Sequence, residues 1–297
     1  MKKLPVIIFF VLITSCRVFS QNAGLYDTDT KPQLISKQFS FTEGPAVDKK
    51  GNVFFTDQPN NKIWKYGTDG KFSVFLDSAG RSNGMYFDGK GNLITCADAK
   101  GELWSVNPKG KVEVLLKDFN GHIFNGPNDV WVRPGDKGIY ITDPYYQRDY
   151  WTRTKSDLDG QKVYYLPKGK HEAVIVDDKL KQPNGIIGTA DGKNLYVADI
   201  GDNKTYRYDI NPDGTLSNRI LFITQGCDGM TIDRQGNVYL CGNGVTIVNP
   251  KGEKIAHIAI DEPWTANICF GGKNKDVLFI TASKAVYTFK MNVKGVN

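Results

Sequence analysis

One short pattern recurs along the chain and limits the folds that the sequence can adopt. A polar residue opens an apolar run, and a turn glycine follows eight residues later. This pair occurs at Glu43 and Gly51, Asn83 and Gly91, Asn184 and Gly192, and Asp228 and Gly236. A copy with a longer turn opens at Asn128, and a degenerate sixth copy opens at Asn267. Successive openings lie 40, 45, 56, 44 and 39 residues apart, a spacing typical of propeller blades.

Strand-like runs fill each repeat. In the first copy they cover residues 53–57, 62–66 and 72–76, which are rich in β-branched and aromatic residues. The last copy lacks a fourth run after residue 290, whereas residues 33–40 precede the first copy and alternate like a strand. The sequence therefore predicts an all-β, six-bladed β-propeller over residues 33–292. We expect its last blade to be closed by the N-terminal strand, because a closed ring leaves no edge unpaired.

The first twenty residues have the features of an export signal. Lys2 and Lys3 precede an apolar run that is too short to span a bilayer as a helix. Cleavage after Ser20 fits an ordinary signal peptidase, and the run that ends at Cys16 resembles a lipobox, so both routes stay open. We expect a signal peptide over residues 1–20 and a flexible segment over 21–32. The protein is then periplasmic or secreted, or a membrane-anchored lipoprotein if Cys16 is lipidated.

Charge and hydropathy argue against several classes of partner. The formal net charge of +6 falls to about +3 once Lys2, Lys3 and Arg17 are removed, and no dense basic tract stands out. Nucleic-acid binding is therefore not expected. No later segment is apolar enough to be transmembrane, and we expect a monomer. The remaining cysteines lie in strand-like runs and are expected to be buried thiols: Cys96, Cys227, Cys241 and Cys269.

The polar openings would meet at one mouth of the central channel, because the first strand of each propeller blade lines that channel. The openings are Glu43, Asn83, Asn128, Asn184, Asp228 and Asn267. The hairpin brings the end of the second strand back beside the opening, which adds Asp57, Asp98, Asp143 and Asp199. Carboxylates crowded in an apolar channel repel one another unless a cation neutralises them. An oxygen-only set suits Ca²⁺ first, then Mg²⁺ or Mn²⁺, and Zn²⁺ less well.

A simpler interpretation of each single opening is a turn signal, since Asx-Gly pairs stabilise turns. Glu43 is a poor turn former, and the openings vary among Glu, Asn and Asp. Both observations favour a ligand role.

Several motifs together resemble the gluconolactonase, senescence-marker-protein and luciferin-regenerating-enzyme family. They include Phe41-Thr-Glu-Gly-Pro45, Asn125-Gly-Pro-Asn-Asp129, Gln182-Pro-Asn-Gly185 and Cys227-Asp-Gly229. The resemblance covers about residues 35 to 290. It implies a calcium-dependent, six-bladed propeller hydrolase with one divalent metal in the channel. It further implies Glu43, Asn128, Asn184 and Asp228 as metal ligands and Asp228 as the catalytic acid/base. Animal members place a sugar-binding arginine where this chain has Gly126.

The chemistry that fits this resemblance is hydrolysis of a sugar or related small lactone by metal-activated water. The cation would polarise the lactone carbonyl, and Asp228 would take a proton from water. Asp143 and Asp199 are alternative bases. We expect the substrate to contact Asn83, Asn128, Asp143, Asp199 and Asn267. Two alternatives stay open, because fold does not fix function: a non-catalytic, metal-stabilised binding propeller and a phosphotriesterase-type hydrolase.

The third repeat is longer than the others because it carries an insertion over residues 144–160. The insertion leaves the second strand directly after Asp143, so we expect it to overhang the metal mouth. Its aromatic residues, with Arg148 and Arg153, would then form a substrate wall, since arginine suits carboxylates and sugar acids. A merely longer surface loop is the alternative.

Overall fold

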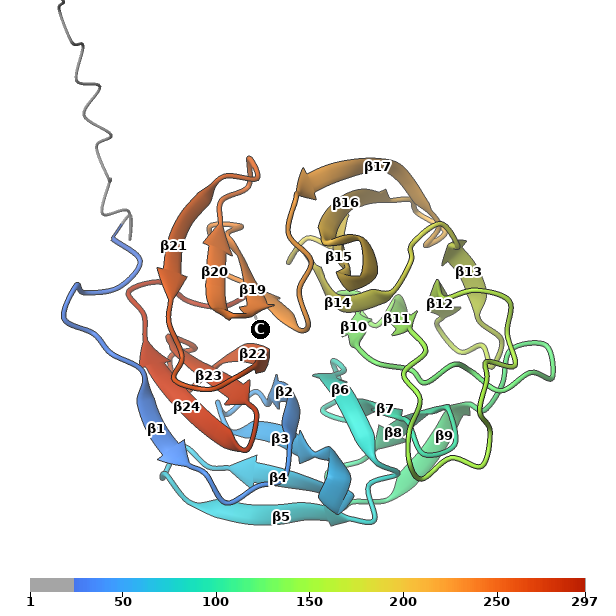
Figure 1. Cartoon of the computed structure of the whole chain (residues 1–297), viewed down its shortest axis with the longest axis horizontal. Helices are drawn as coiled ribbons and strands as arrows, with labels where there is room; N and C mark the ends of the chain where they lie inside the picture. Colours follow the sequence, from blue (N-terminus) through green and yellow to red (C-terminus); the bar gives the residue numbers. More distant parts are fainter. Residues whose placement is uncertain (1–23, 297) are drawn as a thin grey trace, which may run out of the picture.

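Six four-stranded antiparallel sheets surround a central channel in the computed structural model, which describes residues 24–296 (Figure 1). The first blade consists of β2 (Thr42–Val47), β3 (Val53–Asp57), β4 (Lys62–Tyr66) and β5 (Phe72–Asp77). The second consists of β6 (Ser82–Phe87), β7 (Leu93–Ala97), β8 (Glu102–Val106) and β9 (Val112–Leu116). The third consists of β10 (Val130–Val132), β11 (Gly138–Asp143), β12 (Lys162–Pro167) and β13 (Val174–Asp177).

The remaining blades continue the same order from the channel outward. The fourth consists of β14 (Pro183–Gly188), β15 (Asn194–Asp199), β16 (Lys204–Ile210) and β17 (Leu216–Ile223). The fifth consists of β18 (Met230–Ile232), β19 (Val238–Gly242), β20 (Gly244–Val248) and β21 (Lys254–Ile258). The sixth consists of β22 (Thr265–Gly271), β23 (Val277–Ala282), β24 (Ala285–Lys290) and β1 (Gln33–Ser36). Two short 3-10 helices follow β3 and β15: η1 (Gln58–Asn60) and η2 (Ile200–Asp202).

The ring closes as the sequence predicts. Strand β1 pairs antiparallel with β24, so the N-terminal strand supplies the outer edge of the sixth blade. Because every blade then has four strands, the ring has no incomplete sheet. The predicted all-β, six-bladed propeller is confirmed.

In the first, second and fifth blades the turn glycine belongs to a turn built on an aspartate. Asp48 Oδ1 accepts hydrogen bonds from the backbone N–H groups of Lys50 (2.8 Å) and Asn52 (2.9 Å). Gly51 stands inside this turn with φ +89°, a left-handed conformation that favours glycine. Asp88 and Asp233 build the same turn in the second and fifth blades. The inner strands β2 and β14 are buried along their whole length.

The packed chain extends beyond the predicted limits of 33–292. The part of the predicted flexible segment that the structure describes packs on the sixth blade: Leu25 is buried and accepts a hydrogen bond from the Asn292 N–H (2.7 Å). At the other end Val293 is buried and Gly295 pairs with Asp233. The predicted signal peptide, including Cys16, lies outside the described residues.

Two further findings bear on the sequence analysis. The four cysteines in the described part of the chain are free and buried, as predicted. None of the helical segments in residues 24–296 has the length and hydropathy of a membrane-spanning helix.

Candidate active site

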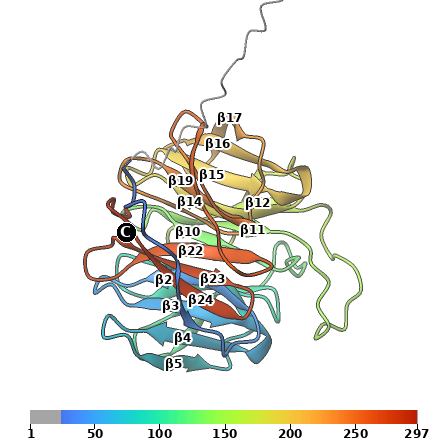
Figure 2. The same ribbon diagram turned by 60° about the vertical axis from the view of Figure 1, so that its left-hand side comes forward.

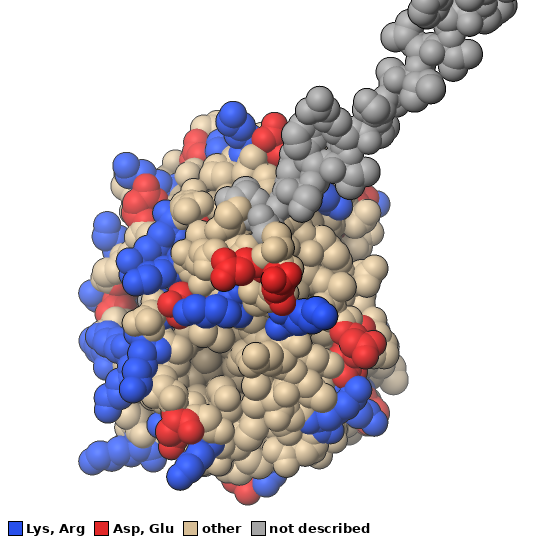
Figure 3. All heavy atoms as spheres, turned by 90° about the vertical axis from the view of Figure 1, so that its left-hand side faces the viewer, with Lys and Arg blue, Asp and Glu red and all other residues tan. Residues whose placement is uncertain are grey.

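The openings of five blades form a ring at one mouth of the channel. Each stands at or just before the start of an innermost strand, and each is 2% to 9% exposed: Glu43, Asn83, Asn128, Asn184 and Asp228. The charged side chains in Figure 3, by contrast, lie on the outer surface, where both signs are interspersed. The structure therefore brings together the four predicted metal ligands and Asn83 and buries them.

The glycine that follows most openings is a packing requirement. A Cβ on Gly44 would stand 2.1 Å from Asn83 O, and one on Gly185 would stand 2.2 Å from Asp228 O. Such distances are far inside van der Waals contact, so adjacent blades touch through bare backbone here. The X-Gly pairs resemble turn signals in the sequence, but their glycines allow adjacent blades to pack closely around the ring.

The sixth opening is Ala266, one residue before the predicted Asn267. Gly84 N–H donates to Asn128 O (2.7 Å), and Gly229 N–H donates to Ala266 O (2.7 Å) in the same way. Ala266 therefore occupies the position of Asn128, and Asn267 occupies the position of Asp129. That second position is glycine in the other four blades.

Asp129 and Asn267 form a floor beneath the ring, which we call the floor pair. They fill space that the glycines leave free: a Cβ on Gly84 would stand 2.3 Å from Asp129 Oδ1, and one on Gly229 would stand 1.9 Å from Asn267 Cγ. Asn267 Nδ2 donates to Glu43 Oε2 (3.1 Å). Asn267, predicted to contact substrate, thus holds a carboxylate of the ring from below.

Burial dominates the electrostatics of the ring and its floor. It raises the pKa of Asp228 to about 6 and that of Asp129 to about 7. Burial, and then the charge of Asp228, raise the pKa of Glu43 well above its ordinary value. Trp264 Nε1 donates to Asp228 Oδ2 (2.6 Å) and opposes the effect of burial there. The site therefore concentrates negative charge that the protein only partly compensates.

Two amide oxygens of the ring also lack partners. Asn83 Oδ1 and Asn184 Oδ1 are buried and accept no hydrogen bond from any described residue. A buried unpaired acceptor costs about 1–3 kcal/mol. Within residues 24–296 no group of three or more His, Cys, Asp or Glu side chains is arranged to hold a metal ion. A cation at the ring would therefore need amide oxygens besides Glu43 and Asp228, and a hard cation such as Ca²⁺ accepts such a set.

The aspartates that end the second strands accept hydrogen bonds from backbone N–H groups. Asp143 accepts hydrogen bonds from Asn125 N–H and Gly126 N–H, both at 2.9 Å. Asp199 does the same for Lys181 and Gln182, and Asp57 for Ser40 and Phe41. Asp143 and Asp199, predicted to contact substrate, thus hold the segments that lead into the inner strands.

We expect Asp143 to make stability depend on pH. Burial raises its pKa to about 7, so the native state binds a proton that the unfolded state has lost. Stability is then highest at low pH and falls between about pH 4 and 7, at about 1.4 kcal/mol per unit for one such group. Urea unfolding in chelator should give a shallower pH dependence for Asp143→Asn than for wild type. Equal slopes would contradict this role.

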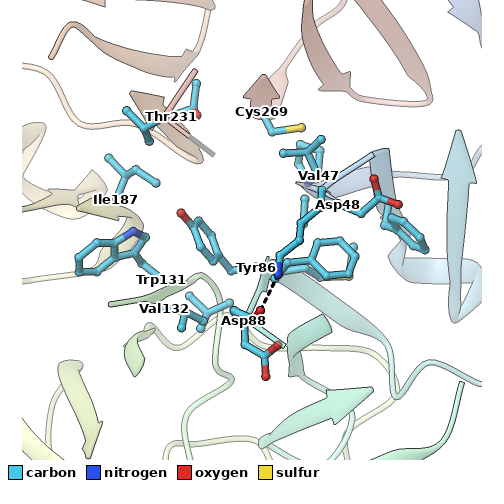
Figure 4. A pocket seen from close by; sticks show the side chains of 18 of the residues that line it. Val47, Asp48, Tyr86, Asp88, Trp131, Val132, Ile187, Thr231 and Cys269 are labelled. Atoms are coloured by element: carbon cyan, nitrogen blue, oxygen red, sulfur yellow. Dashed lines mark hydrogen bonds between the residues drawn. The ribbon is translucent and has the colours of Figure 1, made fainter. Parts of the chain in front are cut away.

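A separate cavity of about 760 Å³ opens at the opposite end of the inner strands (Figure 4). Side chains from several blades line it, among them Tyr86, Trp131, Ile187, Thr231 and Cys269. Asp129 and Asn267 also line it. The floor pair therefore stands between this apolar cavity and the ring.

The floor pair yields a second prediction. Asn267→Ala removes the hydrogen bond that fixes Glu43, and loss of such an outer partner weakens metal binding by about 10- to 100-fold. Calorimetric titration with calcium measures the change. Asn249→Ala, in an exposed turn of the fifth blade, should leave the affinity unchanged. Unchanged affinity in Asn267→Ala would show that the floor pair does not support the ring.

Trp264, near the ring, was not identified from the sequence, and Tyr146 was noted there only as one of the aromatic residues of the insertion. Tyr146 OH accepts a hydrogen bond from Asn184 Nδ2 (3.0 Å), and Trp264 binds Asp228. Tyr146 belongs to the insertion after β11, which therefore reaches over the mouth as predicted. Figure 2 shows this loop and the C-terminus on opposite faces of the ring.

The fold and the ring define a class: six-bladed propellers with a buried, oxygen-rich site at one channel mouth. The chain belongs to the SMP-30/gluconolactonase/LRE-like family, whose model matches residues 41–284. It is 28% identical over 305 residues to a gluconolactonase of Zymomonas mobilis, covering 92% of this chain and 84% of that protein.

Solved structures share the fold. A gluconolactonase of Xanthomonas campestris is 24% identical with a TM-score of 0.84, covering 92% of this chain and 93% of that one. Regucalcin of Agrobacterium tumefaciens, a calcium-binding protein, is 18% identical with a TM-score of 0.74, covering 90% and 95%.

Proposed function

We propose that this protein hydrolyses lactones with the help of a divalent cation held at the ring. The observation that carries the proposal is the ring itself, with two buried carboxylates that repel each other and two unpaired amide oxygens. The similarity to a gluconolactonase supports the substrate class. Calcium suits the all-oxygen set best, ahead of magnesium, manganese and zinc.

Glu43, Asn128, Asn184 and Asp228 would hold the cation. When bound, such an ion polarises a carbonyl and stabilises the negative charge that develops on its oxygen. The chain's own contribution is to fix these side chains. Asn267 holds Glu43 from below, Trp264 holds Asp228, and the ring glycines keep the openings in contact.

Asp228 is the residue that moves the proton. In the reaction a water oxygen bonds to the carbonyl carbon, the ring C–O bond breaks, and the ring oxygen leaves as an alcohol. With Trp264 holding its Oδ2, the Asp228 carboxylate takes the proton from water and returns it to the ring oxygen. Both carboxylate oxygens of Asp143 and of Asp199 accept backbone hydrogen bonds, which makes them poorer bases for this step.

A panel of substrates tests the proposal. Purified protein with added calcium should hydrolyse sugar or aliphatic lactones, followed by acid release at constant pH. Metal bound without hydrolysis of any lactone would favour the binding propeller. Hydrolysis of phosphofluoridates alone would favour a phosphotriesterase-type enzyme.

We also propose that the protein acts outside the cytoplasm, on the basis of its first twenty residues. Fractionation of cells that express the full chain tests this. Recovery only with cytoplasmic markers would contradict it.

A further inference from the structure

The loop between β11 and β12, in the third blade, is fastened to the neighbouring second blade. Asp98 follows β7 at the position where the first, third and fourth blades use an aspartate to hold their own backbone. Its Oδ2 instead accepts hydrogen bonds from Arg148 Nε (2.7 Å) and Tyr150 OH (2.6 Å) of this loop, and a longer one from Gln58 Nε2 (3.2 Å). Trp151 Nε1 donates to Asp98 O (3.1 Å). A buried carboxylate is thus committed to holding this loop, which we call the lid.

The third blade holds the other side of the lid. Arg153 Nη1 donates to Phe124 O (2.8 Å), and its Nη2 donates to Asn125 O (2.5 Å). The Arg153 guanidinium also lies over the Trp151 ring, 3.9 Å from its centroid. The guanidinium of Arg153, predicted as part of a substrate wall, therefore binds groups of the protein itself.

Tyr146 presents a hydroxyl proton to the site. Asn184 Nδ2 donates to its oxygen, so the O–H group itself can donate elsewhere, and no residue within 24–296 accepts a hydrogen bond from it. A phenol keeps its proton at neutral pH, so this hydroxyl is a donor beside an amide of the ring.

Arg148, near Tyr146, also has N–H donors without a protein partner among the described residues. Only its Nε has a partner among the described residues, namely Asp98. Its guanidinium lies 5.5 Å from the centroid of the Tyr146 ring. The two Nη groups therefore lie close to Tyr146 and have no hydrogen-bond partner within residues 24–296.

We propose that Tyr146 and Arg148 are substrate-contacting residues that select lactones bearing hydroxyl groups, as in the lactones of sugar acids. This inference rests on the proposed lactonase function. The lid supplies several N–H and O–H donors without protein acceptors, and an aliphatic lactone offers only its ester oxygens in return. A polyhydroxylated ring supplies acceptors at several positions, and unmet donors in a closed site discriminate against a substrate that lacks them.

The test compares D-glucono-1,5-lactone with δ-valerolactone, which has the same ring without hydroxyl groups. Tyr146→Phe removes one donor, and Arg148→Lys keeps the charge beside Asp98 but loses the planar fork. Each variant should lower kcat/KM for gluconolactone by roughly 10- to 100-fold and that for valerolactone by less than about threefold. Calcium affinity, measured by calorimetry, should stay unchanged in Arg148→Lys. Tyr146→Phe also removes the bond to Asn184, so the rates for the two lactones are compared at a calcium concentration that saturates each variant.

Two matched variants separate recognition from a loosened lid. Tyr150→Phe removes a bond to Asp98 without touching the mouth, and Tyr145→Phe alters a lid tyrosine that contacts Gln147. Both should change the two lactones equally. Equal losses for both lactones in Tyr146→Phe and Arg148→Lys would overturn the inference and leave lactonase activity intact. A wild-type protein that hydrolyses neither lactone would instead overturn the proposed function, and the inference with it.

Discussion

Asp228→Asn should lower lactone turnover about a thousandfold, because removal of a general base costs about 10²- to 10⁴-fold. The substitution removes the proton acceptor and also one of the two carboxylates of the ring. Calcium affinity should therefore fall as well, which calorimetry detects independently of turnover. Trp264 can still donate to the amide oxygen, so the fold is expected to persist.

Asp199→Asn is the matched control for this prediction. Asp199 is also buried, but its oxygens accept hydrogen bonds from Lys181 and Gln182. The folded variant should keep turnover within about threefold of wild type and lose stability instead. If Asp228→Asn kept near-normal turnover and Asp199→Asn lost most of it, the base would be Asp199 and not Asp228.

Gly185→Ala should destabilise the ring through a single added methyl group. Its Cβ would stand 2.2 Å from Asp228 O and 3.3 Å from Cys227 Sγ, so the backbone of the fifth blade must move. Overpacking of this kind costs about 3 kcal/mol. Because the displaced backbone carries Asp228, calcium binding should weaken together with stability.

Gly242→Ala is the corresponding control. The nearest atom to its Cβ would be Trp264 Cη2 at 3.8 Å, which is ordinary contact, and its φ is not in the left-handed region. Its free energy of unfolding in urea should change by less than about 1 kcal/mol. If Gly185→Ala were equally harmless, the blades would not be in contact through bare backbone at the ring.

The fold could be predicted from the sequence because local chemistry sets the period of the repeat and its turn glycines. The Asp48 turn and its copies need the same residues wherever they occur, so they recur visibly. Closure of the ring by β1 could be predicted because the last repeat lacks a fourth strand and an extra strand precedes the first repeat. The convergence of Glu43, Asn128, Asn184 and Asp228 then followed from the symmetry of the ring.

The finer features of the site depend on contacts that no repeat marks. Ala266 has no polar side chain, so only its backbone hydrogen bond reveals it as the sixth opening. Asp143 and Asp199 look like free carboxylates in sequence, because their partners are N–H groups of whatever residues precede the opening. Tyr146 lies in a loop without period, and its place beside Asn184 depends on the anchoring of that loop at Asp98.

The most direct test of the central claim is a calcium titration of chelator-treated protein, with binding and lactone hydrolysis followed in the same preparation. The account predicts that one ion binds per chain and that hydrolysis rises from background in step with its binding. Full hydrolysis by the metal-free protein, or saturation with calcium without any gain in hydrolysis, would contradict the claim that this ring is a metal-dependent active site.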